Sequence, residues 1–274
     1  MTSPLRDIGK LGLFLVLIVS YLFLYLPILH IGLGAFAKNY NFPYPPRWTL
    51  DTFSRLLNNS LYQSALGNSL FLATATAVLS TLLATLATVG LIRFRPRSAK
   101  LLLTLFVAPL FVAEILVGIA SLIFNGLVLE LQGNLISAIL ANTVHCFSYA
   151  LLIIATQLYR YDWRLNDAAM VFGASPARTF FEVTLPLIWP GLLGAFIVTF
   201  IMAFNNLEIS FYLLGATPTL PSVAWGALRY GVKPELYALA TAVNAIVFSI
   251  LIIMFILMRT GLAKFGHRPE REVV

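Results

Sequence analysis

Charged residues are scarce in this sequence. Asp, Glu, Lys and Arg make up 11% of its 274 residues, whereas 59% are hydrophobic. Soluble globular domains carry about 25% charged residues. The composition therefore excludes an ordinary soluble domain and predicts an integral membrane protein built only of helices.

Side chains used in redox, metal and hydrolytic chemistry are also few. Cys146 is the single cysteine, so a disulfide within the chain is excluded, and the three histidines (His30, His145 and His267) are far apart. The sequence has no zinc-ligand spacing, no phosphate-binding loop, no serine-elbow motif and no metalloprotease motif. We therefore expect no catalytic residue, metal or cofactor in this chain.

What the sequence does have is six apolar runs, each long enough to cross a membrane as a helix of about 20 residues. The first follows Arg6 and Lys10, lacks a clear cleavage site and is predicted to be a retained helix. The predicted spans cover residues 11–36, 64–92, 101–124, 135–159, 191–214 and 237–258.

Basic residues flank these runs instead of clustering, which favours membrane lipid and not nucleic acid as the partner of this +7 chain. Lys and Arg number 13 on one set of connecting segments and 5 on the other, and the richer side is predicted to be cytoplasmic. Both termini are then cytoplasmic. The richer set comprises Arg6, Lys10, Arg93, Arg95, Arg97, Lys100, Arg160, Arg164, Arg178, Arg259, Lys264, Arg268 and Arg271; the poorer set comprises Lys38, Arg47, Arg55, Arg229 and Lys233.

Three regions follow from this order. Residues 1–60 hold the N-terminus, the first span and an outside loop with a short helix from Thr52; residues 61–258 form the main transmembrane domain; and residues 259–274 form a cytoplasmic tail. In the second span, Ala73, Ala77, Ser80, Thr81, Ala84 and Thr88 form a small-residue face. That face suits close helix approach, either within the chain or at a subunit interface.

The cytoplasmic segment 160–190 is predicted to be a helix-turn-helix elbow. Asn166 or Asp162 can cap a first short helix, and Gly173 suits the left-handed residue that ends it. Ser175 and Pro176 fit the N-cap and first position of a second helix. Leu185-Pro186 is expected to end that helix, and the fifth span follows.

The spacing within this elbow carries a resemblance. Asp167-Ala168-Ala169, three residues, Gly173, nine residues, then Val183-Thr184-Leu185-Pro186 resembles the EAA loop of permease subunits of bacterial binding-protein-dependent ABC importers, with Asp for Glu and Val for Ile. Segments around Asn68, Pro109 and Glu114, together with Lys233–Thr241, are similar to the second permease of spermidine/putrescine importers. The run Phe204–Glu208 departs from that branch, which leaves polyamine specificity open.

The resemblance implies a six-span, type I ABC importer permease that forms half of a translocation pathway in the bacterial inner membrane. It implies an ATP-binding subunit dimer that holds ATP and Mg, a second permease, which is a homodimer or heterodimer partner, and an extracytoplasmic substrate-binding protein. The residues it assigns to ATPase coupling are Asp167, Ala168, Ala169, Gly173, Ala174, Ser175, Leu185 and Pro186.

Acidic residues within the predicted spans are the candidate substrate contacts. A charge at mid-membrane costs about 2.5–3.5 kcal/mol on insertion scales, so Glu114 and Glu208 should face a bundle interior, a partner or water. Either could bind a cationic solute, or Glu114 could join helices and Glu208 could lie at the outer boundary. The other candidates, which could contact substrate or join helices, are Asn205, Asn206, Phe211 and Tyr212. His145 is expected to be a packed, hydrogen-bonding residue instead of a ligand.

The resemblance implies a small solute, a polyamine or a related organic cation, as the substrate. The alternative substrates are an amino-acid-like amine, a phosphonate and ferric ion. A secondary transporter acting alone is a further alternative, but such proteins often have two repeated halves, and none is apparent here. A membrane scaffold or enzyme is a third alternative, which no nucleophile–base set supports.

Overall fold

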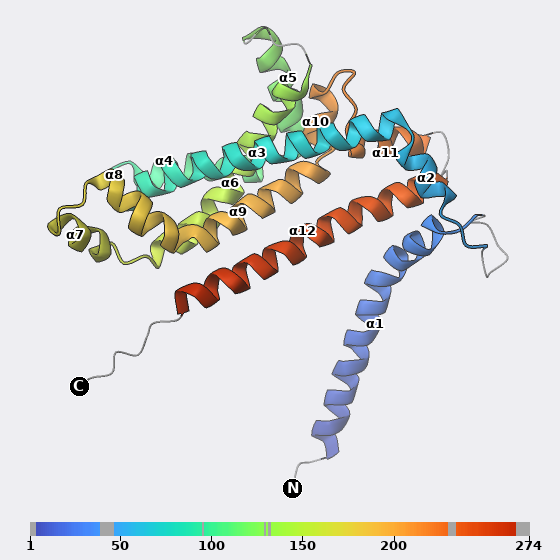
Figure 1. The fold of residues 1–274 in the computed structure, drawn as a ribbon, viewed down its shortest axis with the longest axis horizontal. Coiled ribbons are helices and arrows are strands. Elements are labelled where there is room, and N and C mark those ends of the chain that lie inside the picture. The colour runs from blue at the N-terminus through green and yellow to red at the C-terminus, as the bar shows by residue number, and fades with distance from the viewer. Residues whose placement is uncertain are drawn as a thin grey trace. The chain divides into compact units, whose positions relative to one another are not determined.

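The computed structural model describes residues 4–38, 47–94, 96–128, 130, 133–229 and 234–266. Pro43 of the outside loop, Lys233, and the basic residues Arg95, Arg268 and Arg271 lie outside these residues. The chain divides into two compact units, Met1–Gln63 with Ala224–Ile246, and Ser64–Val223 with Val247–Val274. Figure 1 labels the helices.

The first unit is organised around α1 (Pro4–Ala35), whose apolar side chains are exposed along the span from Lys10. At its C-terminal end the backbone of Lys38 donates to Arg47 (2.8 Å), and α2 (Asp51–Leu57) follows. The short helix expected from Thr52 is therefore present. Gly34 lies so close to Tyr237 that an added Cβ would be 2.8 Å from its ring, and Arg55 pairs with Glu235 at 3.5 Å.

The second unit is built on α3 (Ser60–Arg93), α6 (Leu135–Tyr159) and α9 (Leu185–Asn205). Its apolar core is formed by the packed faces of these helices, where Leu151, Ile154 and Ile188 are almost completely buried. Five of the six residues of the small-residue face of α3 are buried within the chain and Thr81 is partly buried, and Ser80 donates to the Thr143 carbonyl at 3.4 Å. The small-residue face therefore serves helix packing inside this chain.

Five described helices are long and apolar enough to cross a membrane, and one bent pair brings the number to six when it is counted as a single span. The bent pair lies in the third predicted span, which is not one straight helix. It consists of α4 (Ala99–Val107), the 3₁₀ turn η1 (Ala108–Phe111) and α5 (Glu114–Leu127), with a bend of 106°.

The physical reason for the bend is local. Pro109 lacks a backbone donor, and Val112 and Ala113 have ψ angles of 131° and 135°, which interrupt the helix. Hydropathy alone does not reveal such a break, because the residues around it are apolar.

The fifth predicted span also ends earlier than expected. α9 stops at Asn205, Asn206 has an extended backbone (ψ 115°), and the short helix α10 (Glu208–Leu213) follows. Near the end of the chain, α11 (Leu220–Arg229) precedes α12 (Pro234–Gly266). Because α12 continues to Gly266, residues 259–266 are helical and only the remainder of the expected tail follows it.

Gly118 of α5 lies against the backbone of α10. A Cβ at this position would lie 3.1 Å from the Glu208 carbonyl oxygen and 3.1 Å from the Ile209 Cα, both of them backbone atoms. Overpacking of this kind costs about 1–3 kcal/mol. We expect Gly118→Val to lower the thermal unfolding temperature of the detergent-purified chain, whereas Gly126→Val, at a glycine with open space, leaves it nearly unchanged. Equal effects would contradict the packing.

Candidate functional site: a cytoplasmic elbow and an intramembrane polar junction

The predicted elbow begins with α7 (Arg164–Val171), and the way this helix ends explains the glycine at position 173 of the motif. Gly173 has φ +91°, its N–H donates to the Met170 carbonyl (2.9 Å), and the Ala174 N–H donates to the Ala169 carbonyl (3.1 Å). These two bonds form a Schellman motif, which requires a left-handed residue where Gly173 stands. The expected role of Gly173 as a helix terminator is confirmed by this geometry.

The second arm of the elbow starts at Ser175. Its hydroxyl accepts from the Arg178 N–H (3.3 Å), and Pro176 opens α8 (Pro176–Thr179), as expected from the sequence. Leu185 and Pro186 do not end this helix, however. A π-helical segment, η2 (Phe180–Thr184), joins α8 to α9 without a break. This π-helical segment directly precedes Pro186, which lacks a backbone donor. The second arm of the elbow and α9 therefore form one continuous helix.

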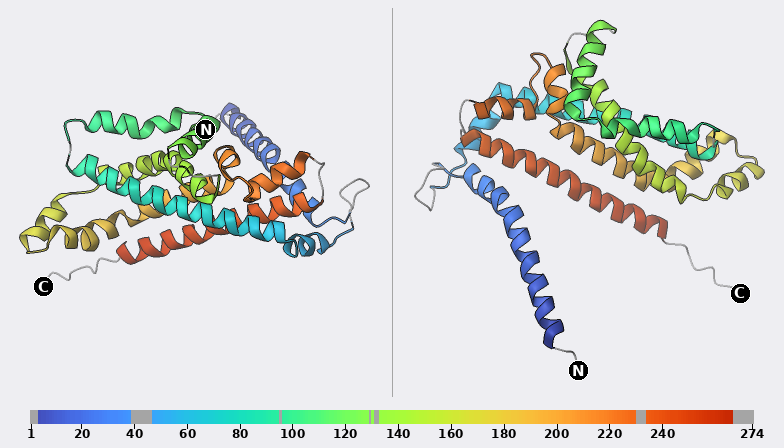
Figure 2. Two further views of the ribbon diagram at one scale, coloured as in Figure 1. Left: turned by 90° about the horizontal axis from the view of Figure 1, so that it is seen from above. Right: turned by 180° about the vertical axis from the view of Figure 1, so that it is seen from behind.

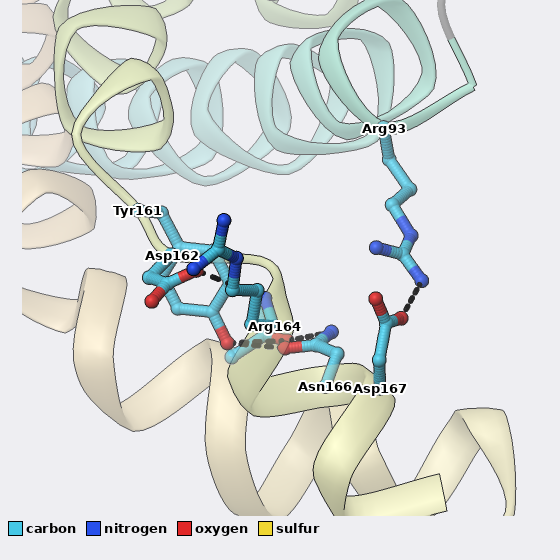
Figure 3. Close-up of polar contacts among 7 residues, drawn as sticks. Arg93, Tyr161, Asp162, Arg164, Asn166 and Asp167 are labelled. Atoms are coloured by element: carbon cyan, nitrogen blue, oxygen red, sulfur yellow. Dashed lines mark hydrogen bonds and ion pairs between the residues drawn. The ribbon is translucent and has the colours of Figure 1, made fainter.

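A buried polar network locks the two arms together. Asn166 donates from Nδ2 to Thr184 Oγ1 (2.9 Å), and the Tyr161 hydroxyl donates to Asn166 Oδ1. Asn166 is therefore an interior residue of α7 and not its cap, since its side chain is used in this network. Near the helix start, Asp162 Oδ1 accepts from the Arg164 N–H at 3.0 Å. Figure 3 shows Tyr161 and Asn166 pointing toward each other.

Asp167, the first motif residue, has a partner from a distant part of the chain. Arg93, the last residue of α3, donates from Nη2 to Asp167 Oδ1 at 2.8 Å across 74 residues of sequence (Figure 3). The Arg93 guanidinium also lies 5.0 Å from the centre of the Trp163 ring. The elbow is thus bonded to α3 in addition to its covalent connections to α6 and α9.

Part of the exposed surface of α7 is apolar. Ala168 is exposed, Ala169 is partly exposed, and at the C-terminal end of α7 the side chains of Val171 and Phe172 are 85% and 91% exposed. α7 and α8 lie together at one end of the second unit (Figure 1, Figure 2). An exposed aromatic at a helix end is a natural anchor for a partner protein.

A second polar feature joins the two helix breaks within the membrane spans. Glu114 is the first residue of α5, where the helix dipole favours a carboxylate. Its Oε2 accepts from Asn206 Nδ2 at 2.5 Å, and Asn206 Oδ1 accepts from the N–H groups of Ile209 (2.9 Å) and Ser210 (3.3 Å) at the start of α10. Asn206 therefore caps α10 and binds Glu114 with the same side chain.

His145 of α6 lies next to the carboxylate of Glu114. Its side chain is 4% exposed, its Nε2 is 3.3 Å from Glu114 Oε1, and its ring meets Tyr149 edge to face. The ring nitrogens make no hydrogen bond of good geometry with a described residue, although that distance is within ion-pair range. One turn earlier, Asn142 donates to Ser210 Oγ at 3.0 Å. α6 thus supplies polar contacts to both broken helices.

The remaining predicted pathway residues lie apart from these hydrogen bonds. Asn205 is exposed and donates to the Ile201 carbonyl of its own helix (3.0 Å). Glu208 is exposed and has no ion pair with a described residue. Phe211 is 46% exposed, and its ring stands almost perpendicular to that of Tyr212, 5.5 Å away. The Glu114 side chain is 35% exposed, although it accepts a hydrogen bond from Asn206.

Sequence reasoning missed the residues that hold these features in place. Tyr161 and Trp163 were not predicted to belong to the site, Thr184 was named only within the motif run, and Arg93 was counted for topology alone. His145 was predicted to be a packed, hydrogen-bonding residue, but its ring nitrogens make no hydrogen bond with a described residue. A signal did exist for Arg93, because it ends a span on the side that carries Asp167. Nothing in the sequence pairs Glu114 with Asn206, 92 residues away.

Comparisons with known proteins identify the family to which this chain is similar. Residues 80–261 match the family model described as a binding-protein-dependent transport system inner membrane component. The chain is 29% identical over 235 residues to the putrescine transport system permease protein PotI of Escherichia coli K12, covering 83% of this chain and 84% of that protein. It is 25% identical to the spermidine/putrescine permease PotC of Haemophilus influenzae, covering 88% and 94%.

Solved structures show the same fold at lower identity. A bacterial ABC transporter that imports the acidic polysaccharide alginate contains a chain that superposes with a TM-score of 0.72 at 17% identity, covering 95% of this chain and 98% of that one. A chain of the inward-facing methionine transporter MetNI gives a TM-score of 0.62 at 16% identity, covering 73% and 96%.

Proposed function

The chain belongs to the family of inner membrane components of binding-protein-dependent transport systems, and on that premise we propose that it forms half of the translocation pathway of a polyamine importer driven by ATP. It is a transport subunit of the bacterial inner membrane. A second permease, related but distinct, completes the pathway, and an extracytoplasmic binding protein delivers the solute, in keeping with the family description. Both termini face the cytoplasm, as the distribution of Lys and Arg indicates.

The elbow is the coupling element. The Asn166–Thr184 hydrogen bond joins its two arms, and the second arm continues into α9. A force on α7 therefore reaches a membrane span through a stiff connection. The exposed Val171 and Phe172 side chains dock on an ATP-binding subunit, one of a pair that holds ATP and Mg. Closure of that pair moves the elbow, which opens the pathway outward to receive solute. The single observation that carries this mechanism is the locked elbow itself.

The substrate class follows from the polar junction and the relatives. An organic ammonium is stabilised by a carboxylate and by aromatic faces. Glu114 offers a partly exposed carboxylate at the start of α5, and Glu208, Phe211 and Tyr212 of α10 are exposed or partly exposed. Asn205 supplies an additional exposed amide. The relatives named as putrescine and spermidine/putrescine permeases support a polyamine as the solute.

The test is uptake by the complete complex in proteoliposomes, with its ATP-binding subunits, second permease and binding protein. We expect ATP-dependent uptake of labelled putrescine or spermidine, unaffected by excess amino acid, phosphonate or ferric ion. Competition by one of those three solutes, without polyamine uptake, would overturn the substrate class. Uptake by this chain alone on an ion gradient would overturn the coupling mechanism and favour a secondary transporter.

A further inference from the structure

We infer that Arg93 is a positioning residue that makes α3 move with the elbow, through its ion pair with Asp167 and its contact with Trp163. The inference rests on the proposed coupling role of the elbow and adds a third path from the elbow into the membrane. α6 and α9 receive the motion through the backbone, whereas α3 receives it through the Arg93 side chain.

The geometry favours a defined link. Arg93 is the last residue of α3, where a cation is stabilised by the helix dipole, and Asp167 is in the first turn of α7, where an anion is stabilised. The helix dipole therefore stabilises each charge at its own helix end, even without the ion pair. The guanidinium is held from two directions, by the Asp167 carboxylate at 2.8 Å and by the Trp163 ring at 5.0 Å.

The role is positional and not a matter of fold stability. The Asp167 side chain is 60% exposed and that of Arg93 is 28% exposed, and pairs this accessible add little to stability. The buried network of Tyr161, Asn166 and Thr184 holds the elbow without help from Arg93. Loss of the Arg93 contacts should therefore leave the elbow folded but free to move without α3.

The same contact gives a reason for Asp at the first motif position. The family pattern has Glu there, and a side chain longer by one methylene would displace the carboxylate from its present contact with Arg93. In this chain, Asp167 meets a guanidinium of its own α3 at 2.8 Å. A short carboxylate suits this internal pair, so Asp167→Glu should weaken the link while keeping the charge.

The experiment compares polyamine uptake and ATP hydrolysis by the reconstituted complex. We expect Arg93→Gln to lower uptake per ATP hydrolysed several-fold, Asp167→Asn to act similarly, and the double variant to lose no more than either single one. Arg97→Gln is the matched control, because Arg97 is exposed and makes no ion pair with a described residue. Additive losses, or no loss in Arg93→Gln, would overturn the inference.

A covalent link provides a second readout that keeps the test decisive if a variant assembles poorly. In a Cys146→Ser background, which removes the single native cysteine, Arg93→Cys and Asp167→Cys are joined by a short cleavable thiol cross-linker. Coupling should be restored by cross-linking and lost again on cleavage. Unchanged coupling would contradict the link. Ala168→Asp separates the two proposals. If Ala168→Asp uncouples uptake from ATP hydrolysis and Arg93→Gln does not, the elbow assignment stands and the Arg93 inference fails. If both variants leave uptake normal, the elbow assignment itself fails.

Discussion

Replacing Ala168 with Asp is expected to abolish polyamine uptake while the chain still inserts into the membrane and folds. Ala168 is exposed on α7, so the substitution disturbs no packing within the chain. In the docked complex it would place an unpaired carboxylate against the ATP-binding subunit. An uncompensated buried charge costs about 3–5 kcal/mol, and about 1.4 kcal/mol corresponds to a tenfold change in affinity. Docking should therefore weaken by roughly 100-fold or more.

The measurement is uptake and ATP hydrolysis in proteoliposomes that contain equal amounts of inserted protein. Ala177→Asp is the control, because it introduces the same charge on an exposed position of α8, near a helix start where an acidic residue is favoured. Gly173→Pro should also uncouple, since φ +91° is closed to proline. Gly173→Ala should be milder, at about 1–2 kcal/mol of strain. Normal uptake in Ala168→Asp and Gly173→Pro would refute the elbow assignment.

Replacing Glu114 with Ala is expected to produce the second large effect, a loss of uptake with ATP hydrolysis and assembly retained. The change removes the acceptor for Asn206 Nδ2 and the carboxylate beside His145 Nε2. Hydrogen bonds to charged groups contribute about 1.5–3 kcal/mol each. Uptake should therefore fall by about tenfold or more, both because a cation loses its carboxylate and because the α5–α10 junction loosens.

Two substitutions separate these causes. Glu114→Gln retains a side-chain oxygen that can accept from Asn206 but removes the charge, so it isolates the role of the carboxylate toward a cation. Glu208→Gln removes an exposed charge that has no ion pair with a described residue, and it should lower uptake less than Glu114→Gln. The measurement is the initial rate of putrescine uptake. A Glu114→Ala variant with wild-type uptake would remove this residue from the pathway.

Local features of the fold were predictable because their causes lie within a few residues. The apolar run 135–159 coincides with α6, Gly173 is left-handed as its place after a short helix indicated, and Ser175 caps α8 through its own hydroxyl. Each of these depends on backbone geometry or hydropathy read over one or two helical turns. The elbow could therefore be placed from the sequence, with its first motif residues on α7.

Features that depend on distant contacts could not be predicted in the same way. Asn166 looked like a helix cap because a free Asn near a helix start prefers that role, but a bond to Thr184 holds it inside α7. Pro186 looked like a terminator, but the preceding π-helical segment accommodates it. The break before Glu114 is stabilised by Asn206, 92 residues away, and hydropathy does not encode such a partner.

The most direct test of the proposed coupling role is cross-linking of the elbow to the ATP-binding subunit. A photoreactive amino acid replaces Phe172, which is 91% exposed at the end of α7, in the complete complex. We predict a cross-link to the ATP-binding subunit whose yield changes when ATP is added. The same group in place of Trp48, which is 61% exposed on the opposite predicted side, should give none. Absence of the Phe172 cross-link, or its transfer to the extracytoplasmic binding protein, would contradict the coupling role and the orientation together.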